Sequence, residues 1–300
     1  MPGICEGRVV VVTGAGRGIG KAHALAFASE GARVVVNDLG VELDGTGSST
    51  GPAGEVVDEI RAMGGEAVAN GDDVADFDGA ARLIRSAIDR FGTLDVLVNN
   101  AGIIRDRMLV NLDVDEWDAV TRVHLRGTFG PTRHAASYWR ERSKAGEPVD
   151  ARVINTSSYA GLFGNVGQTH YSAAKAGIAS FTRVAAAELG RYGVTVNAIA
   201  PTARTRMTEH LPYGMQKPES GFDTQAPENV SPLVVWLGSP ESRDVTGQVF
   251  MLTGGSVEVA LNWQRGPRVE HEQRWEPSQL GGVVKDLLSQ MPELPKVLGS

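Results

Sequence analysis

The stretch Arg8-Val-Val-Val-Val-Thr-Gly-Ala-Gly-Arg-Gly-Ile-Gly20 joins a run of β-branched residues to a glycine-rich turn, and a helical segment follows it. In this order of strand, turn and helix, a glycine motif indicates a dinucleotide site rather than an ordinary loop. We expect Gly14 to make the tight turn, Gly18 to let the backbone approach a pyrophosphate, and Gly20 to let the helix pack on the strand. The start of the helix then faces the phosphates.

Similar β-branched runs alternate with helical stretches along the chain. The predicted strands are residues 8–12, 33–37, 66–70, 94–99, 152–156, 194–200 and 248–252. Several are apolar on both faces, as is typical of parallel strands that helices cover on both sides. The pattern predicts an α/β fold, a doubly wound parallel sheet of about seven strands in a single Rossmann-like domain. We place this domain at residues 1–256 and a C-terminal extension, with a short helix near 277–290, at residues 257–300.

The composition restricts the possible partners. The chain has 300 residues, 29 of them basic and 36 acidic, and a net charge of −7, which argues against nucleic acid or an anionic membrane surface as the main partner. The single cysteine, Cys5, permits no internal disulfide, and the six histidines show no spacing typical of a metal site. Neither a secretory signal nor a long apolar run is present, so we expect a cytoplasmic protein.

Tyr171 and Lys175, in Tyr171-Ser-Ala-Ala-Lys175, lie one helical turn apart, so their side chains project toward one point. A tyrosine normally loses its proton near pH ~10, and a nearby cation favours the charged form. The pair therefore predicts a general base at neutral pH. The hydroxyl of Ser157 or Ser158 could hold a carbonyl or alcohol oxygen there. With a bound dinucleotide, these groups predict the interconversion of an alcohol and a carbonyl.

Asp38, which ends the second predicted strand, favours NAD over NADP. A carboxylate there can accept both adenosine-ribose hydroxyls and repels a 2′-phosphate. The alternative is a turn cap in Asn-Asp-Leu-Gly. Arg17 could attract a phosphate, but repulsion at hydrogen-bonding distance outweighs one flexible arginine.

Two further turns are placed to contact a dinucleotide. Asp73-Val74 follows the third predicted strand and could hold an adenine between an acceptor and an apolar wall. Asn99-Asn-Ala-Gly102 ends the fourth strand at the edge of the sheet where ligands collect. Each could instead be an Asx-turn.

Together, the glycine turn, Asn99-Asn-Ala-Gly102, Ser158 and Tyr171 with Lys175 resemble the short-chain dehydrogenase/reductase (SDR) family over about residues 6–256. The resemblance implies a three-layer fold, a nicotinamide cofactor, and dimers or tetramers built on the long central helices. It implies that Tyr171 is the acid/base, that Lys175 lowers its pKa and holds the nicotinamide ribose, and that Ser158 positions the substrate oxygen. The candidate cofactor contacts are Gly14, Arg17, Gly18, Ile19, Gly20, Asp38, Asp73, Val74, Asn100, Ala101, Gly102, Tyr171, Lys175 and Pro201.

Residues 35–40, 105–108 and 122–127 resemble the hydroxyacyl-CoA dehydrogenase domain of peroxisomal multifunctional enzyme type 2, a subgroup of that family. This resemblance implies NAD-linked oxidation of a (3R)-hydroxyacyl-CoA, and stand-alone relatives include hydroxysteroid dehydrogenases. The chain departs from the family pattern twice: His124 stands where an asparagine is usual, and Thr202 where a glycine follows the proline.

Residues 202–225 form the candidate substrate lid. A set of large apolar residues in it favours a bulky apolar ligand, although packing of the loop on the domain is an equally good interpretation. These residues are Met207, Leu211, Tyr213, Met215 and Phe222. Arg105 and Arg107 could meet the phosphates of a coenzyme A thioester. The leading prediction is an NAD-dependent dehydrogenase that acts on a secondary hydroxyl of an acyl-CoA or steroid-like substrate. The alternatives to it are an NADPH-linked 3-oxoacyl reductase and a non-catalytic nucleotide-sensing protein.

Overall fold

The computed structural model describes residues 2–40, 51–206, 208, 217–261, 263–293 and 295–299. Within them, one sheet has the strand order β3-β2-β1-β4-β5-β6-β7-β8. All its neighbouring strands are parallel except β7 and β8. The strands are β1 Val9–Thr13, β2 Arg33–Asn37, β3 Glu66–Asn70, β4 Val96–Asn99, β5 Ala151–Thr156, β6 Val194–Thr202, β7 Val249–Thr253 and β8 Ser256–Val259.

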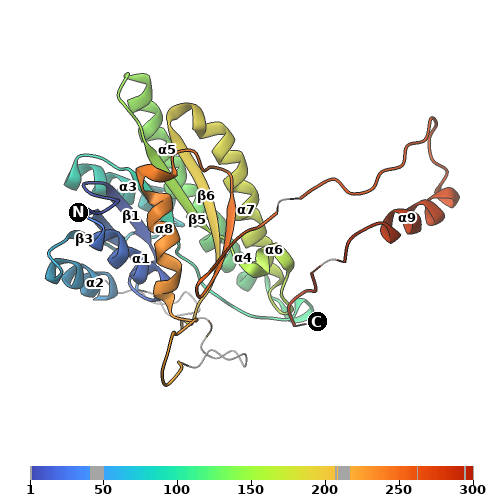
Figure 1. Ribbon diagram of the computed structural model, residues 1–300, viewed down its shortest axis with the longest axis horizontal. Coiled ribbons are helices and arrows are strands. Elements are labelled where there is room, and N and C mark those ends of the chain that lie inside the picture. Colours follow the sequence, from blue (N-terminus) through green and yellow to red (C-terminus); the bar gives the residue numbers. More distant parts are fainter. Residues whose placement is uncertain are drawn as a thin grey trace.

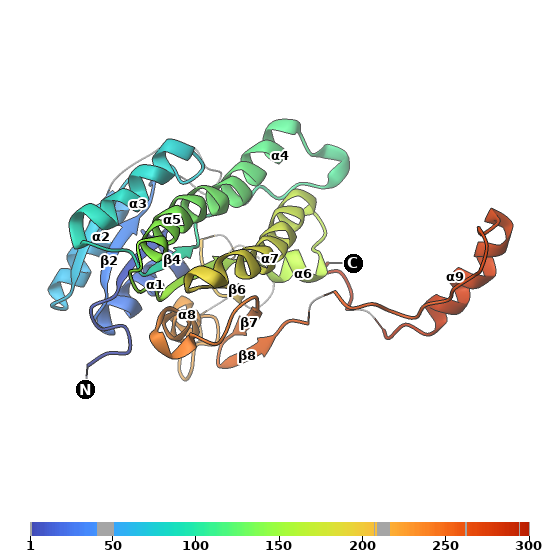
Figure 2. The same ribbon diagram turned by 90° about the horizontal axis from the view of Figure 1, so that it is seen from above.

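Helices cover both faces of this sheet (Figures 1 and 2). The helices are α1 Gly18–Ser29, α2 Gly51–Ala62, α3 Phe77–Phe91, α4 Val114–Thr121, α5 Gly127–Lys144, α6 Tyr159–Phe163, α7 Thr169–Leu189, α8 Ser231–Gly238 and α9 Leu280–Ser289. Val10 and Val12 of β1 pack toward α1, α2 and α8, whereas Val9 and Val11 pack toward α3, α5 and α7. Because successive side chains of a strand alternate between faces, a strand made only of apolar residues serves two cores. The predicted three-layer, doubly wound fold is confirmed.

The sheet has one strand more than the seven predicted. After β7 the chain turns at Gly254, whose φ is +56°, and β8 returns antiparallel along the edge. All four residues of β8 are exposed, so the strand carries no buried pattern that marks it in the sequence. It extends the sheet beyond residue 256, where the predicted domain ends.

The C-terminal extension projects from the domain as an arm that carries α9 (Figures 1 and 2). The predicted helix at 277–290 corresponds to a 3-10 turn, η6 Pro277–Gln279, followed by α9. The chain then returns to the domain beside α6, where the Val166 N–H donates to the Leu298 carbonyl at 2.9 Å. Among the helices of the described ranges, none is both long and apolar enough to cross a lipid bilayer.

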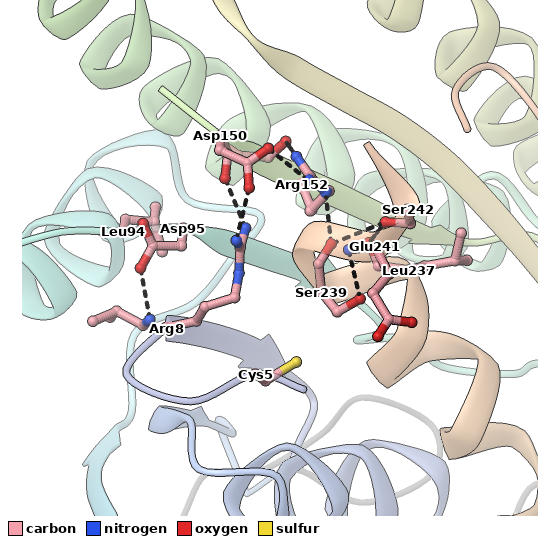
Figure 3. A network of polar contacts seen from close by, with 12 residues as sticks. Cys5, Arg8, Leu94, Asp95, Asp150, Arg152, Leu237, Ser239, Glu241 and Ser242 are labelled. Atoms are coloured by element: carbon pink, nitrogen blue, oxygen red, sulfur yellow. Dashed lines mark hydrogen bonds and ion pairs between the residues drawn. The ribbon is translucent and has the colours of Figure 1, made fainter. Parts of the chain in front are cut away.

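An ionic network, in which Arg152 is buried and the Asp150 side chain is 51% exposed, fastens the amino-terminal ends of β1 and β5 (Figure 3). Asp150 lies between two arginines: Arg8 donates to its carboxylate at 3.0 Å, and Arg152 lies 2.6 Å from its other oxygen. Arg152 is 1% exposed, and its Nε also donates to the Ser239 carbonyl at 3.1 Å, just beyond α8. Burial by itself would raise the pKa of Asp150, but the hydrogen bonds and charges of Arg152 and Arg8 outweigh it and hold that pKa below its ordinary value.

We expect Asp150→Asn to lower the free energy of unfolding at pH 7, because it leaves two arginine side chains without their counter-ion. A carboxylate with a depressed pKa in the folded state stabilises the protein above its unfolded pKa, and that contribution is lost as the pH falls through the folded pKa. The difference between variant and wild type should therefore disappear at pH values well below about 4. Urea unfolding across this range measures it. Glu141→Gln, which breaks the exposed pair with Arg140, is the matched control and should change little at any pH.

Candidate active site

The glycine turn after β1 is fitted against the turn after β4. Gly14 has φ +62°, and a Cβ there would lie 2.7 Å from the Ala101 Cα. The Asn100 side chain donates to the carbonyls of Thr13 at 3.0 Å and Gly14 at 3.1 Å. A Cβ on Gly20 would collide with the Gly14 carbonyl and the Asn100 amide. The two turns therefore leave no space for side chains, as a backbone cradle for a dinucleotide requires.

The start of α1 has the form expected for a phosphate site. Gly18 has φ +53°, and Arg17 precedes it in an extended conformation with its side chain exposed. Ile19 packs against the hydrophobic core and so anchors the first turn of the helix. Thr205, in the described part of the predicted lid, lies over Gly18, with its Cγ2 3.3 Å from where a Cβ would be. The helix dipole and the free N–H groups at this end fit an anionic group.

Asp38 lies beside the glycine turn. Its carboxylate accepts the Gly16 N–H at 2.8 Å and the Gly40 N–H at 2.7 Å. The bond to Gly40 is the turn cap that was the alternative interpretation, and the bond to Gly16 brings the carboxylate to the glycine turn as the cofactor interpretation requires. The two roles are compatible, because each carboxylate oxygen has two acceptor positions.

The Asp73 carboxylate already has two partners within the protein, which the sequence does not predict. Its carboxylate accepts the Ala75 N–H at 2.8 Å and pairs with Arg122 at 2.6 Å. Val74 is buried and packs at the start of α5, 3.0 Å from where a Cβ on Gly127 would be. Asp73 therefore forms the expected alternative, an Asx-turn, and its contact with adenine stays a prediction.

The two adjacent serines after β5 have different surroundings. Ser157 is 1% exposed, and its hydroxyl donates to the Lys175 carbonyl at 2.8 Å, which ties β5 to α7. Ser158 is half-buried, begins α6 and accepts the Ala160 N–H at 3.2 Å, and its hydroxyl is close enough to the Tyr171 phenol to lower the pKa of that phenol. The structure thus brings Ser158, and not Ser157, to the tyrosine.

Lys175 is buried below Tyr171. Its ammonium lies 5.6 Å from the centre of the tyrosine ring and donates to the Thr156 carbonyl at 2.6 Å. Burial lowers the pKa of Lys175 to about 7. Burial also raises the pKa of Tyr171, a hydrogen bond from Ser158 lowers it, and the Asp106 charge raises it; the sum lies above the ordinary value. From the sequence we expect Lys175 to lower the pKa of Tyr171. In the protein alone, the effects of burial and of Asp106 outweigh any lowering, and the pKa lies above its ordinary value.

A chain of buried amides supports this site and was missed in the sequence. Asn99 donates to Asn155 of β5 and to Thr132 of α5, both at 2.9 Å, and Asn155 donates to Thr182 of α7 at 2.9 Å. The only sequence signal is polar residues that end otherwise apolar strands. The network joins two central strands to the two helices that cover them.

The predicted thioester contacts are only partly placed. The Arg107 backbone pairs with Gly167, just before α7, but the Arg107 side chain bonds to Glu116 at 2.9 Å.

Pro201, a candidate cofactor contact, lies inside β6, opposite Leu252 of β7. Of the apolar lid residues, Phe222 is 65% exposed. The others, Met207, Leu211, Tyr213 and Met215, lie outside the described residues.

The comparison with known proteins decides the family. The sequence model described as short chain dehydrogenase matches residues 8–214. The chain belongs to the short-chain dehydrogenase family. This short-chain dehydrogenase is therefore an oxidoreductase of a family that uses an NAD or NADP cofactor, and the cradle after β1 fits such a group.

Its relatives support the resemblance to hydroxyacyl-CoA dehydrogenases. Hydroxyacyl-CoA dehydrogenase ChsB1 of Mycobacterium tuberculosis is 46% identical over 289 residues, which cover 94% of this chain and 88% of that protein. Peroxisomal multifunctional enzyme type 2 of Mus musculus is 44% identical over 260 residues, which cover 87% of this chain and 33% of that longer enzyme. The crystal structure of a short chain dehydrogenase from Mycobacterium avium is 61% identical, covers 99% of this chain and 100% of its own, and has a TM-score of 0.90.

The two serines provide a matched pair of variants for this short-chain dehydrogenase. We expect Ser158→Ala to lower kcat by about 10²-fold or more, because it removes the hydroxyl that is predicted to hold the substrate oxygen. Ser157→Ala should lower the free energy of unfolding by about 1 kcal/mol through the lost bond to Lys175, with a smaller effect on kcat. Steady-state rates and urea unfolding of both variants measure this. A larger loss of kcat in Ser157→Ala would reverse the assignment.

Proposed function

We propose that this short-chain dehydrogenase oxidises the secondary hydroxyl of a 3-hydroxyacyl-CoA with NAD. The grouping of the Ser158 hydroxyl, the Tyr171 phenol and the buried Lys175 ammonium, which lies 5.6 Å from the centre of the tyrosine ring, carries this proposal. It provides one point at which an alcohol oxygen can be held and its proton removed. A nucleotide-sensing protein on the same fold has no use for these three side chains together.

In this mechanism Ser158 holds the substrate oxygen and Tyr171 takes its proton. A bound nicotinamide would supply the acceptor for the hydride that the same carbon loses. The carbon–oxygen single bond becomes the carbonyl. Because burial raises the pKa of Tyr171, the protein's own groups leave the phenol protonated at neutral pH. The phenol is then ready to donate a proton in the reverse direction, and oxidation is favoured by alkaline conditions.

The preference for NAD rests on Asp38. Its carboxylate lies 2.8 Å from the Gly16 nitrogen, at the turn that receives the adenosine half of a dinucleotide. A 2′-phosphate placed there meets a negative charge at short range. Arg17, the exposed residue that follows Gly16 in the same turn, is the group that would favour NADP.

The substrate class rests on the relatives named hydroxyacyl-CoA dehydrogenase and on an apolar rim. Arg107 donates its backbone N–H to the Gly167 carbonyl, just before α7, and the segment after it exposes Met108, Leu109 and Val110 at 53%, 64% and 89%. Exposed adjacent apolar side chains of this kind suit an acyl chain. Arg107 is engaged by Glu116, so we do not assign it to the thioester phosphates.

A second copy of the chain is the partner that we propose for the outer face of α5 and α7. Phe129 of α5 and Val184 of α7 are 45% and 55% exposed there. They border a hollow of about 560 Å³ between the two helices. This face supports the dimer or tetramer that the family resemblance implies.

We expect Tyr171→Phe to lower kcat by at least about 10²-fold, because the ring keeps its packing and loses the transferable proton. In the wild type the rate of oxidation should rise with pH and the rate of ketone reduction should fall, as follows from a tyrosine pKa above its ordinary value. Tyr192→Phe, in the 3-10 turn η3 Gly190–Tyr192 that follows α7, is the control and should leave both profiles in place. Near-normal turnover by a folded Tyr171→Phe protein would remove Tyr171 from the reaction.

The substrate and cofactor are tested by following NADH absorbance with 3-hydroxyacyl-CoA thioesters of several chain lengths and with free hydroxysteroids. We expect higher kcat/KM for the thioesters and for NAD over NADP, and Asp38→Ala should narrow the cofactor preference by removing the repulsion. A wild-type preference for NADPH and 3-oxoacyl substrates would favour the reductase instead.

A further inference from the structure

His124 is the departure from the family pattern that lies nearest to Tyr171. It is part of a π-helical segment, η2 Arg122–Arg126, which joins α4 to α5 and packs against α7. Its side chain is 1% exposed. A π-helical turn is rare and frequently lies at a functional site, so a buried imidazole at this point calls for a physical reason.

The His124 ring is pressed against the turn after β4. Its Nε2 lies 2.8 Å from the Ile103 carbonyl oxygen and 3.3 Å from the Ile103 nitrogen, and in the tautomer that carries its proton on Nε2 the ring donates to the nearer of these, the carbonyl. A Cβ on Gly102 would lie 2.5 Å from the His124 Cε1. Residue 102 must therefore be glycine for the ring to occupy this position, independently of any cofactor.

The same ring contacts the reacting tyrosine. The His124 and Tyr171 ring centres are 5.1 Å apart, and the rings are almost perpendicular, at 88°. This edge-to-face arrangement is the favourable geometry for two aromatic rings. One side chain thus touches both the strand-end turn and the catalytic helix.

The surroundings keep the imidazole uncharged. The groups facing it are Lys175 and His170 from α7 and the Ile103 carbonyl from the β4 turn. Burial, followed by the Lys175 charge, holds the pKa of His124 well below its ordinary value, against the opposing effect of the Ile103 hydrogen bond. A neutral ring can donate to Ile103 without placing a second cation beside Lys175.

We propose that His124 is a positioning residue for Tyr171: the imidazole of His124 holds the Gly102–Ile103 backbone and the tyrosine ring in one fixed arrangement. The proposal rests on the proposed role of Tyr171 as the acid/base. It gives a function to the side chain at this position, and it makes residues 102 and 124 a coupled pair. Misplacement of a reacting group by about 1 Å is enough to cost up to about 10²-fold in rate.

The test is a double-mutant cycle on kcat with Gly102→Ala, His124→Ala and the double variant. The assay uses NAD and whichever secondary alcohol the wild type oxidises fastest, so that an error in the acyl-CoA assignment leaves the cycle intact. We expect Gly102→Ala to lower kcat about 10-fold or more in the His124 protein and less than about twofold further in His124→Ala, where the clash is absent. An equal penalty in both backgrounds would show that glycine serves only the cofactor and would overturn the coupling.

Positioning is separated from plain structural support by two further variants and a pH profile. His124→Ala should lower kcat with little change in the KM for NAD, and should move the pH limb that belongs to Tyr171. His124→Phe, which keeps a ring against the tyrosine, should retain more activity than His124→Ala. Leu125→Ala removes packing of the same segment on α7, where Leu125 lies 2.8 Å from a Cβ position on Gly177, and should leave the pH limb in place. An unmoved limb in His124→Ala would refute the proposal.

Discussion

The close approach of the turns after β1 and β4 is the constraint on which the rest of the site depends. Gly14 comes so near Ala101 that any Cβ would overlap, and the Asn100 amide satisfies the Thr13 and Gly14 carbonyls that the end of the strand leaves without a ladder partner. The two strands are neighbours where the strand order reverses direction, and connections leave toward opposite sides there. The crevice for a dinucleotide is thus a consequence of topology, made usable by residues without side chains.

The second constraint on the site is the buried Lys175 ammonium, whose hydrogen-bond partner, the Thr156 carbonyl, is uncharged. Lys175 is 3% exposed, and it keeps one hydrogen bond to the Thr156 carbonyl while burial lowers its pKa. Burying an ammonium is costly unless it is paired or hydrogen bonded, so α7 must be fixed in register on β5. The bond from Ser157 to the Lys175 carbonyl provides that register. The same register brings Tyr171 to Ser158.

Much of the fold follows from patterns that are local in the sequence. The seven predicted strands all exist, and most of them are apolar runs with turn residues on both sides; β3, Glu66–Asn70, is the exception, with one buried residue. β8 was not predicted because its side chains are exposed and show no buried pattern. Its extended conformation depends on antiparallel pairing with β7, which the residues of β8 alone do not indicate. In the site, Tyr171, Lys175 and Ser158 are brought together as spacing and motif predicted. The engagement of Arg107 by Glu116 and of Asp73 by Arg122 was not predictable, because each pair joins segments whose relative position depends on the packed helices.

The sequence by itself determined the sheet, the glycine turn and the types of side chain available for chemistry, since these depend on period, turn geometry and functional groups that are written in neighbouring residues. Only the tertiary structure decided which charges are engaged and which groups are desolvated. Segments that are distant in the sequence pack around Tyr171 and His124 and exclude water from both. This burial raises the pKa of Tyr171 and presses His124 against Gly102. Desolvation depends on everything that surrounds a group in space, and no local pattern of residues encodes it.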